Sequence, residues 1–119
     1  MYADNDSLGV SPDFVELAAE VLGLLSDPTR IRIVLALRQA EELPVNALAK
    51  IVDRKPSGVS QHLARLRMAR MVTTRQDGTS VLYRLTDEHA ASLVLEAVKQ
   101  AEHAIAHGQI PPHHRLDQS

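Results

Sequence analysis

Histidines are concentrated towards the C-terminal end of this chain, where they could bind a transition-metal ion. Five of the six lie after residue 85: His89, His103, His107, His113 and His114. If residues 89–107 are helical, the first three share a strip of surface about 60° wide with Glu96 and Gln100. The chain has no cysteine, and imidazole and carboxylate ligands without sulfur suit Ni(II), Co(II) or Zn(II). The alternative is a solvated helix face followed by an incidental pair of histidines.

The spacing of His89 and His103 is too large for both to bind one ion within one helix. They are fourteen positions apart, which is about 21 Å along a helix, whereas a ligand atom lies about 2.1 Å from its metal. Two antiparallel helices, related by a two-fold axis near residue 96, would bring His89 of one chain close to His103 of the other. The apolar stripe from Ala90 to Ala104 is centred near the same residue. Both features predict an isologous homodimer with two equivalent sites between subunits.

Basic residues are concentrated in the middle of the chain. Between Lys50 and Arg84 there are eight basic residues and only two acidic ones, although the whole chain has a net charge of −2. A basic segment between acidic flanks is typical of one surface that faces DNA. The alternative is a charged face that contacts only solvent.

These residues must be positioned by a small helical domain, beginning with two helices. Serine or aspartate followed by proline, at residues 11–12 and 27–28, predicts the start of each helix. The first helix should run to about Leu25. The second should bury a stripe formed by Ile31, Val34 and Leu35, with Leu37 as a further candidate.

The next segments predict a helix-turn-helix followed by a β-hairpin. Pro44 and Pro56 open two short helices on either side of a polar turn. Two β-prone runs, 72–75 and 81–85, flank a turn at Asp77-Gly78. Thr86 should cap the last helix, with Asp87 and Glu88 in its first turn. The expected fold is therefore mainly α with a β-hairpin: a winged helix-turn-helix of about five helices plus the wing, dimerising through its terminal helices.

The helix opened by Pro56 has the pattern of a DNA-reading helix. Val59, Leu63 and Leu66 recur on one side and should be buried. Serine and glutamine on the opposite side can hydrogen-bond to bases in the major groove, and flanking arginines suit phosphates. His62, near the buried side, is expected to pack or cap rather than to read bases. The candidate DNA-binding residues are Lys55, Ser57, Ser60, Gln61, Arg65 and Arg67 on or beside this helix, with Arg75 and Thr79 on the wing.

Length and composition place limits on the class of protein. We expect a flexible arm over residues 1–10, one domain over 11–107 and a histidine-containing tail over 108–119. No stretch approaches the roughly 20 apolar residues of a membrane span, and the N-terminus lacks a signal-peptide pattern. A cytosolic location is therefore expected. The sequence contains neither a His-Glu-x-x-His motif nor a serine or cysteine nucleophile paired with a local base, so we do not expect an enzyme.

Several stretches together resemble the ArsR/SmtB family of metal-responsive winged-helix repressors. They read LSDPTR at 25–30, SGVSQHL at 57–63, RQDG at 75–78 and YRL at 83–85. The resemblance covers nearly the whole chain. It implies a homodimer that binds double-stranded operator DNA when metal-free and releases it on binding metal, so as to control metal-efflux genes.

The resemblance also implies two alternative sets of metal ligands. The family's usual zinc pattern falls on Asp87, His89, Gln100 and His103, but glutamine is a weak ligand where histidine is usual. The pattern of its nickel- and cobalt-sensing members falls on residues that are all present: His89, Glu102, His103, His113 and His114. We therefore expect Ni(II) or Co(II), with Zn(II) possible, and Asp87 or His107 as an additional ligand. The family's cysteine site has no counterpart at residues 43–48. The competing hypothesis is a winged-helix regulator that senses no metal.

Overall fold

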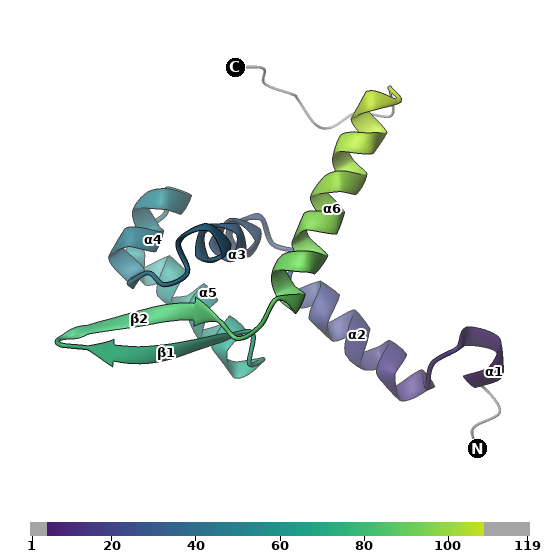
Figure 1. The fold of residues 1–119 in the computed structure, drawn as a ribbon, viewed down its shortest axis with the longest axis horizontal. Helices are drawn as coiled ribbons and strands as arrows, with labels where there is room; N and C mark the ends of the chain where they lie inside the picture. The colour runs from purple at the N-terminus through teal and green to yellow at the C-terminus, as the bar shows by residue number, and fades with distance from the viewer. Residues whose placement is uncertain (1–4, 109–119) are drawn as a thin grey trace.

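The computed structural model describes residues 5–108 of the chain. The chain forms a helical domain from which one hairpin extends (Figure 1). Its elements, in chain order, are α1 (Asn5–Leu8), α2 (Pro12–Leu24), α3 (Pro28–Ala40), α4 (Val45–Val52), α5 (Pro56–Met68), β1 (Val72–Asp77), β2 (Ser80–Leu85) and α6 (His89–Ala106). The winged helix-turn-helix expected from the sequence is confirmed, with the short helix α1 as an unpredicted addition within residues 1–10.

The first two long helices begin at the predicted caps. The side chain of Ser11 accepts a hydrogen bond from the backbone N–H of Asp13, at 3.3 Å. Asp27 Oδ1 accepts from the backbone N–H groups of Thr29 and Arg30, at 2.8 and 3.1 Å. In both cases the next residue is a proline in the first helical turn, where its missing N–H has no consequence. These caps satisfy donors that a helix start otherwise leaves unpaired.

The core is centred on α3, which contacts α4, α5, α6 and β2. Its largest fully buried side chains come from three helices and the first strand: Ile33, Val34, Leu37, Leu48, Val59, Leu63, Leu66 and Val72. The predicted stripe on α3 was partly wrong: Val34 and Leu37 are enclosed as expected, but Ile31 and Leu35 are only half-buried, and Ile33, which was not predicted, is enclosed. A helix with neighbours on several sides buries more than one stripe of its surface.

The wing is a two-stranded antiparallel hairpin whose strands pair from Val72↔Leu85 to Asp77↔Ser80. Gly78, with a φ of 65°, occupies the turn, as the Asp-Gly signal predicted. The connection between α3 and α4 lies against the hairpin, where Leu43 and Tyr83 exchange two backbone hydrogen bonds of 3.0 and 2.9 Å. This pairing fixes the base of the wing to the helical domain.

The start of α6 differs from the prediction. The helix begins at His89 rather than just after Thr86, because the Thr86 backbone N–H donates to the carbonyl of Met71 and continues the hairpin. The capping carboxylate is Asp87, whose Oδ1 accepts from the His89 backbone N–H at 2.9 Å. Glu88 is the residue that precedes the helix and does not cap it with its side chain. Ala90, Ala91 and Val94 then anchor α6 in the core.

Two helices, α2 and α6, project away from the wing (Figure 1). Both carry apolar side chains that are exposed in the isolated chain. No residue of α2 is buried. Its exposed apolar residues are Phe14 at 66%, Val15 at 41%, Leu17 at 50% and Leu22 at 55%, and α6 adds Leu93 at 40% and Ile105 at 37%. Within residues 5–108, no helix combines the length and the apolar character that crossing a membrane requires.

Candidate DNA-reading surface and metal site

The exposed face of α5 presents the short polar side chains predicted to read DNA. Ser57, Ser60 and Gln61 are exposed, as are the other residues of this face, Ala64 and Met68. On the opposite side Val59, Leu63 and Leu66 are fully buried. Small side chains let a helix backbone approach the major groove, and glutamine can pair with adenine through two hydrogen bonds. The helix therefore packs on the core through its apolar side and leaves the side that carries Ser57, Ser60 and Gln61 exposed.

Basic side chains lie at both ends of α5. Lys55 precedes the helix, and Arg65 and Arg67 lie in its last turn. All three are exposed, and none takes part in an ion pair with another described residue. Uncompensated basic groups around a polar helix face suit the phosphates on either side of a groove.

The two wing residues predicted to bind DNA have different surroundings. Thr79 lies exposed in the hairpin turn. Arg75 instead forms a two-point ion pair with Glu42, with Nε···Oε2 and Nη2···Oε1 distances of 2.7 and 2.8 Å. The hydrogen bonds from Arg75 lower the pKa of Glu42, and those to Glu42 raise the pKa of Arg75. Glu42 was not among the predicted residues, since it lies 33 positions away and no sequence signal relates the two.

His62 packs on the inner side of α5, as the sequence indicated. Its Nδ1 accepts a hydrogen bond of 3.0 Å from Nε of Arg30, which lies in the first turn of α3. This contact occupies the Nδ1 nitrogen and joins the half-buried ring to the first turn of α3. His62 is therefore no part of the reading face. The role of Arg30 was not anticipated.

The candidate metal ligands of α6 are exposed but widely separated. His89 begins the helix, whereas Glu102 and His103 lie in its last two turns. Within the described part of one chain, no three histidine, aspartate or glutamate side chains lie close enough to hold a metal ion. His113 and His114 lie outside the described residues. A single chain thus provides the ligands at two distant points, in agreement with the spacing argument.

His103 and His107 form a pair at the C-terminal end of α6. Their ring centroids are 4.2 Å apart, and His107 Nδ1 lies 3.0 Å from the carbonyl oxygen of His103. When Nδ1–H donates to that carbonyl, the lone pair of His107 is on Nε2, and the residue is exposed. Two histidines at positions i and i+4 of a helix can bind the same metal ion. The structure thus brings His107 beside His103, one of the predicted ligands.

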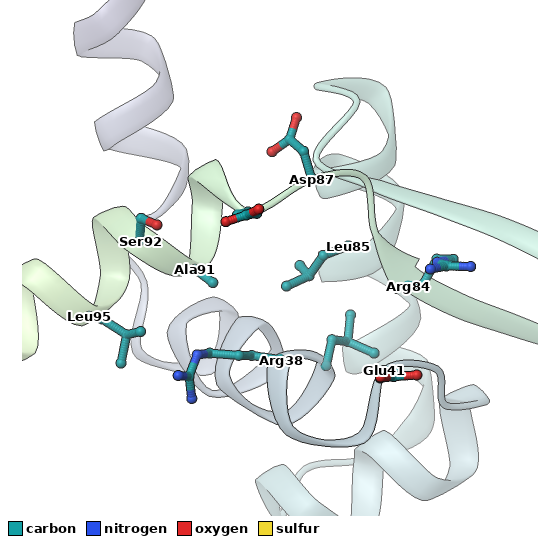
Figure 2. A pocket seen from close by; sticks show the side chains of 10 residues that line it. Arg38, Glu41, Arg84, Leu85, Asp87, Ala91, Ser92 and Leu95 are labelled. Atoms are coloured by element: carbon teal, nitrogen blue, oxygen red, sulfur yellow. The ribbon is translucent and has the colours of Figure 1, made fainter.

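Asp87 lies on the rim of a pocket at the other end of α6 (Figure 2). The pocket has a volume of about 480 Å³ and lies between α3, β2 and α6. Figure 2 shows Arg38 and Glu41 on α3 and the loop after it, with Arg84 on β2. One oxygen of Asp87 accepts from the His89 N–H at 2.9 Å, which holds this carboxylate beside the start of α6.

Comparison with known proteins agrees with this architecture. A helix-turn-helix domain family matches residues 25–75. Over 115 residues the chain is 48% identical to the HTH-type transcriptional regulator KmtR of Mycobacterium tuberculosis, covering 97% of this chain and 86% of that protein. The chain belongs to the ArsR/SmtB family of winged-helix transcriptional repressors. Members of the ArsR/SmtB family named in these comparisons are transcriptional regulators rather than enzymes.

Two solved structures with ArsR/SmtB-type folds are similar to this chain. The AntR antimony-specific transcriptional repressor has a TM-score of 0.73 and 26% identity, covering 82% of this chain and 87% of its own. A homodimeric winged helix-turn-helix domain from Mycobacterium bovis, a possible ArsR-family regulator, has a TM-score of 0.70 and 25% identity. That match covers 95% of this chain and 96% of the other. The chain thus shares its overall fold with these two structures.

Proposed function

We propose that this protein is a metal-responsive repressor that binds operator DNA as a homodimer and releases it on binding Ni(II) or Co(II), with Zn(II) as a weaker possibility. The proposed response to metal rests on one observation, the distribution of candidate ligands along α6. His89 lies at its first residue and the His103–His107 pair at its end, and one described chain does not close a site. A second copy is the simplest source of the missing ligands.

The proposed dimer interface is formed by α2 and α6. Apolar side chains on these two helices are exposed in the isolated chain, and Phe14, Leu17 and Leu22 are at least half exposed. An apolar surface of this kind is normally covered by a partner. The similarity to a homodimeric winged helix-turn-helix domain supports the formation of a dimer. If the α6 helices cross antiparallel near Glu96, each His89 approaches His103 of the other subunit.

The proposed metal ligands are His89 from one subunit and Glu102 and His103 from the other. His113 and His114 complete the proposed set. A ligand set of nitrogen and oxygen with more than four members favours octahedral Ni(II) or Co(II) over tetrahedral Zn(II). His107 is a further candidate because it lies against His103, and Asp87 because it lies beside His89.

The proposed DNA contacts divide into two kinds. Ser57, Ser60 and Gln61 read bases, whereas Lys55, Arg65 and Arg67 bind phosphates. Thr79 contacts the neighbouring backbone from the wing. Arg75 joins them only when its ion pair with Glu42 opens.

Release of DNA requires that metal binds more tightly to the dimer form with low DNA affinity. Metal between two α6 helices fixes their relative position, and α6 packs on α3, which in turn contacts α5. A change in helix crossing therefore changes the spacing of the two α5 helices. By linkage, operator DNA must weaken metal binding by the same factor.

The DNA half is tested by selecting duplexes from a random pool with the wild-type protein and measuring binding by fluorescence anisotropy. Gln61→Ala should lose about 1–3 kcal/mol for the selected duplex and little for a scrambled one. Arg67→Ala should weaken both duplexes to a similar extent and reduce the salt dependence by about one ion. If Gln61→Ala weakened binding to the selected and the scrambled duplex equally, as Arg67→Ala should, the assignment of Gln61 as a base-reading residue would be wrong.

The metal half is tested by adding nickel to the same complex. Wild-type protein should release the selected duplex, and His103→Ala should bind the duplex normally but fail to release it. Lys99→Ala, a change on an exposed residue of the same helix, is the matched control and should behave as wild type. Normal release by His103→Ala would contradict the ligand assignment, and no heat on titrating nickel, cobalt or zinc would favour the regulator that senses no metal.

A further inference from the structure

A single guanidinium group joins the proposed dimer helix to the proposed DNA-reading helix. Arg30 Nη1 donates to the carbonyl oxygen of Leu24, the last residue of α2, at 2.9 Å. Its Nε donates to Nδ1 of His62, in the middle of α5, at 3.0 Å. Arg30 is partly buried and these contacts are 6 and 32 positions away in the sequence. The side chain thus bridges two elements that are not otherwise joined by a side-chain hydrogen bond among the described residues.

The backbone that carries Arg30 is itself fixed. Asp27 Oδ1 accepts from the backbone N–H of Arg30 at 3.1 Å and from that of Thr29 at 2.8 Å. Burial raises the pKa of Asp27, but these two backbone hydrogen bonds and the nearby His62 and Arg30 outweigh it and lower the pKa overall. The aspartate therefore stays ionised at neutral pH and holds the first turn of α3. The guanidinium extends from a rigid base.

The contact with His62 is made next to the reading face. Gln61, the preceding residue, is exposed, and Leu63, the following one, is fully buried. A hydrogen bond to the His62 ring therefore restrains rotation of α5 about its own axis at the position where Gln61 projects. Small rotations of this kind matter, because paired hydrogen bonds to a base depend strongly on geometry.

We propose that Arg30 is a positioning residue that transmits the orientation of α2 to the DNA-reading face of α5. The inference rests on the proposed function and adds to it a specific connection between dimer and DNA. A shift of α2 in the dimer moves the Leu24 carbonyl. The guanidinium, held by the Leu24 carbonyl and the His62 ring, then moves His62 and with it Gln61. The two hydrogen bonds use different nitrogens of one planar group, and lysine cannot reproduce them.

Two substitutions of His62 separate hydrogen bonding from packing. His62→Asn keeps an acceptor near the position of Nδ1, whereas His62→Leu fills similar space without one. For a duplex selected with wild-type protein, His62→Leu should lower the ratio of specific to scrambled binding about tenfold, and His62→Asn should stay within about twofold of wild type. Binding to the scrambled duplex should not change, because no phosphate contact is lost.

Substitution of Arg30 provides the second side of the comparison. Arg30→Lys keeps the charge but offers one nitrogen, so it should lower the specificity ratio about as much as His62→Leu. The double variant should lose no more than either single variant, because both remove one shared contact. Thermal unfolding followed by circular dichroism tests whether each variant is folded. If His62→Leu does not fold, the specificity ratio of Arg30→Lys alone tests the positioning role.

The outcomes distinguish this inference from the proposed function. If wild-type protein shows no preference for any duplex, the proposed function and the inference are both wrong. If wild-type protein has a preference that His62→Leu and Arg30→Lys retain, the function stands and the positioning role is wrong. The positioning role is equally overturned if His62→Asn loses as much specificity as His62→Leu.

Discussion

Arg75 on the wing and Glu42 in the α3–α4 connection form a two-point ion pair, with distances of 2.7 and 2.8 Å. An arginine binds a phosphate in the same two-point geometry. The Glu42 carboxylate therefore occupies the guanidinium that Arg75 is proposed to offer to DNA. Beside this pair, Leu43 and Tyr83 hold the backbone together. The wing therefore keeps its place without the ion pair, and the ion pair chiefly determines whether Arg75 is available.

Glu42→Gln should strengthen DNA binding. The freed guanidinium can contact a phosphate, and because an exposed ion pair is weak, affinity should rise by up to about fivefold. The logarithmic dependence of affinity on salt should steepen by about one. Glu41→Gln, which removes the same charge from the neighbouring residue without breaking an ion pair, is the control. Weaker binding by Glu42→Gln would show that the pair instead orients the wing for DNA.

Stability at acidic pH should depend on Asp27. Its pKa is lowered in the folded protein from an ordinary value of 3.8. A lowered carboxyl pKa stabilises the fold fully above the ordinary value, and this contribution is lost as pH falls through the lower folded-state value. Asp27→Asn keeps a good helix cap but does not titrate.

The measurement is the free energy of unfolding by urea between about pH 5 and pH 2. Wild-type protein should lose more stability over this range than Asp27→Asn, so that the two curves converge at the acidic end. Asp13→Asn is the control, because the side chain of Asp13 caps no helix. Parallel curves for wild type and Asp27→Asn would contradict the role of the charge.

Dimerisation should depend on the apolar surface of α2. Leu22 is 55% exposed in the isolated chain and lines an apolar groove with Leu93 and Ala97 of α6. Leu22→Glu would place a charge in the proposed interface and should give folded monomers in sedimentation equilibrium. Ile51→Glu changes a residue that is 57% exposed on α4, away from that surface, and should remain dimeric. A dimer that survives Leu22→Glu would rule out the groove between α2 and α6 as part of the interface.

Most of the fold could be predicted from local sequence signals. Ser11 and Asp27 cap helices as expected because capping is decided within three residues, and Asp77-Gly78 forms the hairpin turn for the same reason. The predicted start of α6 was wrong because the backbone N–H of Thr86 donates a hydrogen bond to the carbonyl of Met71, which extends the hairpin. That contact lies outside any local window.

The site was predictable only where a single helix determines it. The exposure of Ser60 and Gln61 follows from helical periodicity and is found in the structure. The contacts of Arg30 with His62 and of Arg75 with Glu42 join residues more than 30 positions apart. Their formation depends on tertiary packing, which neither residue type nor spacing specifies.

In the proposed dimer, each metal site takes His89 from one subunit and His103 from the other. Neither a His89→Ala dimer nor a His103→Ala dimer has a complete site on this account. A mixed dimer of the two variants has one site lacking both histidines and one site in which both are intact. If the two residues belonged to a site within one subunit, the mixed dimer would have no complete site.

The decisive measurement is nickel stoichiometry by equilibrium dialysis of the mixed dimer, isolated by two different affinity tags. We expect about one tightly bound nickel ion per mixed dimer, against about two per wild-type dimer and none in either homodimeric variant. A mixed dimer that binds no nickel tightly would contradict a metal site shared between the two subunits.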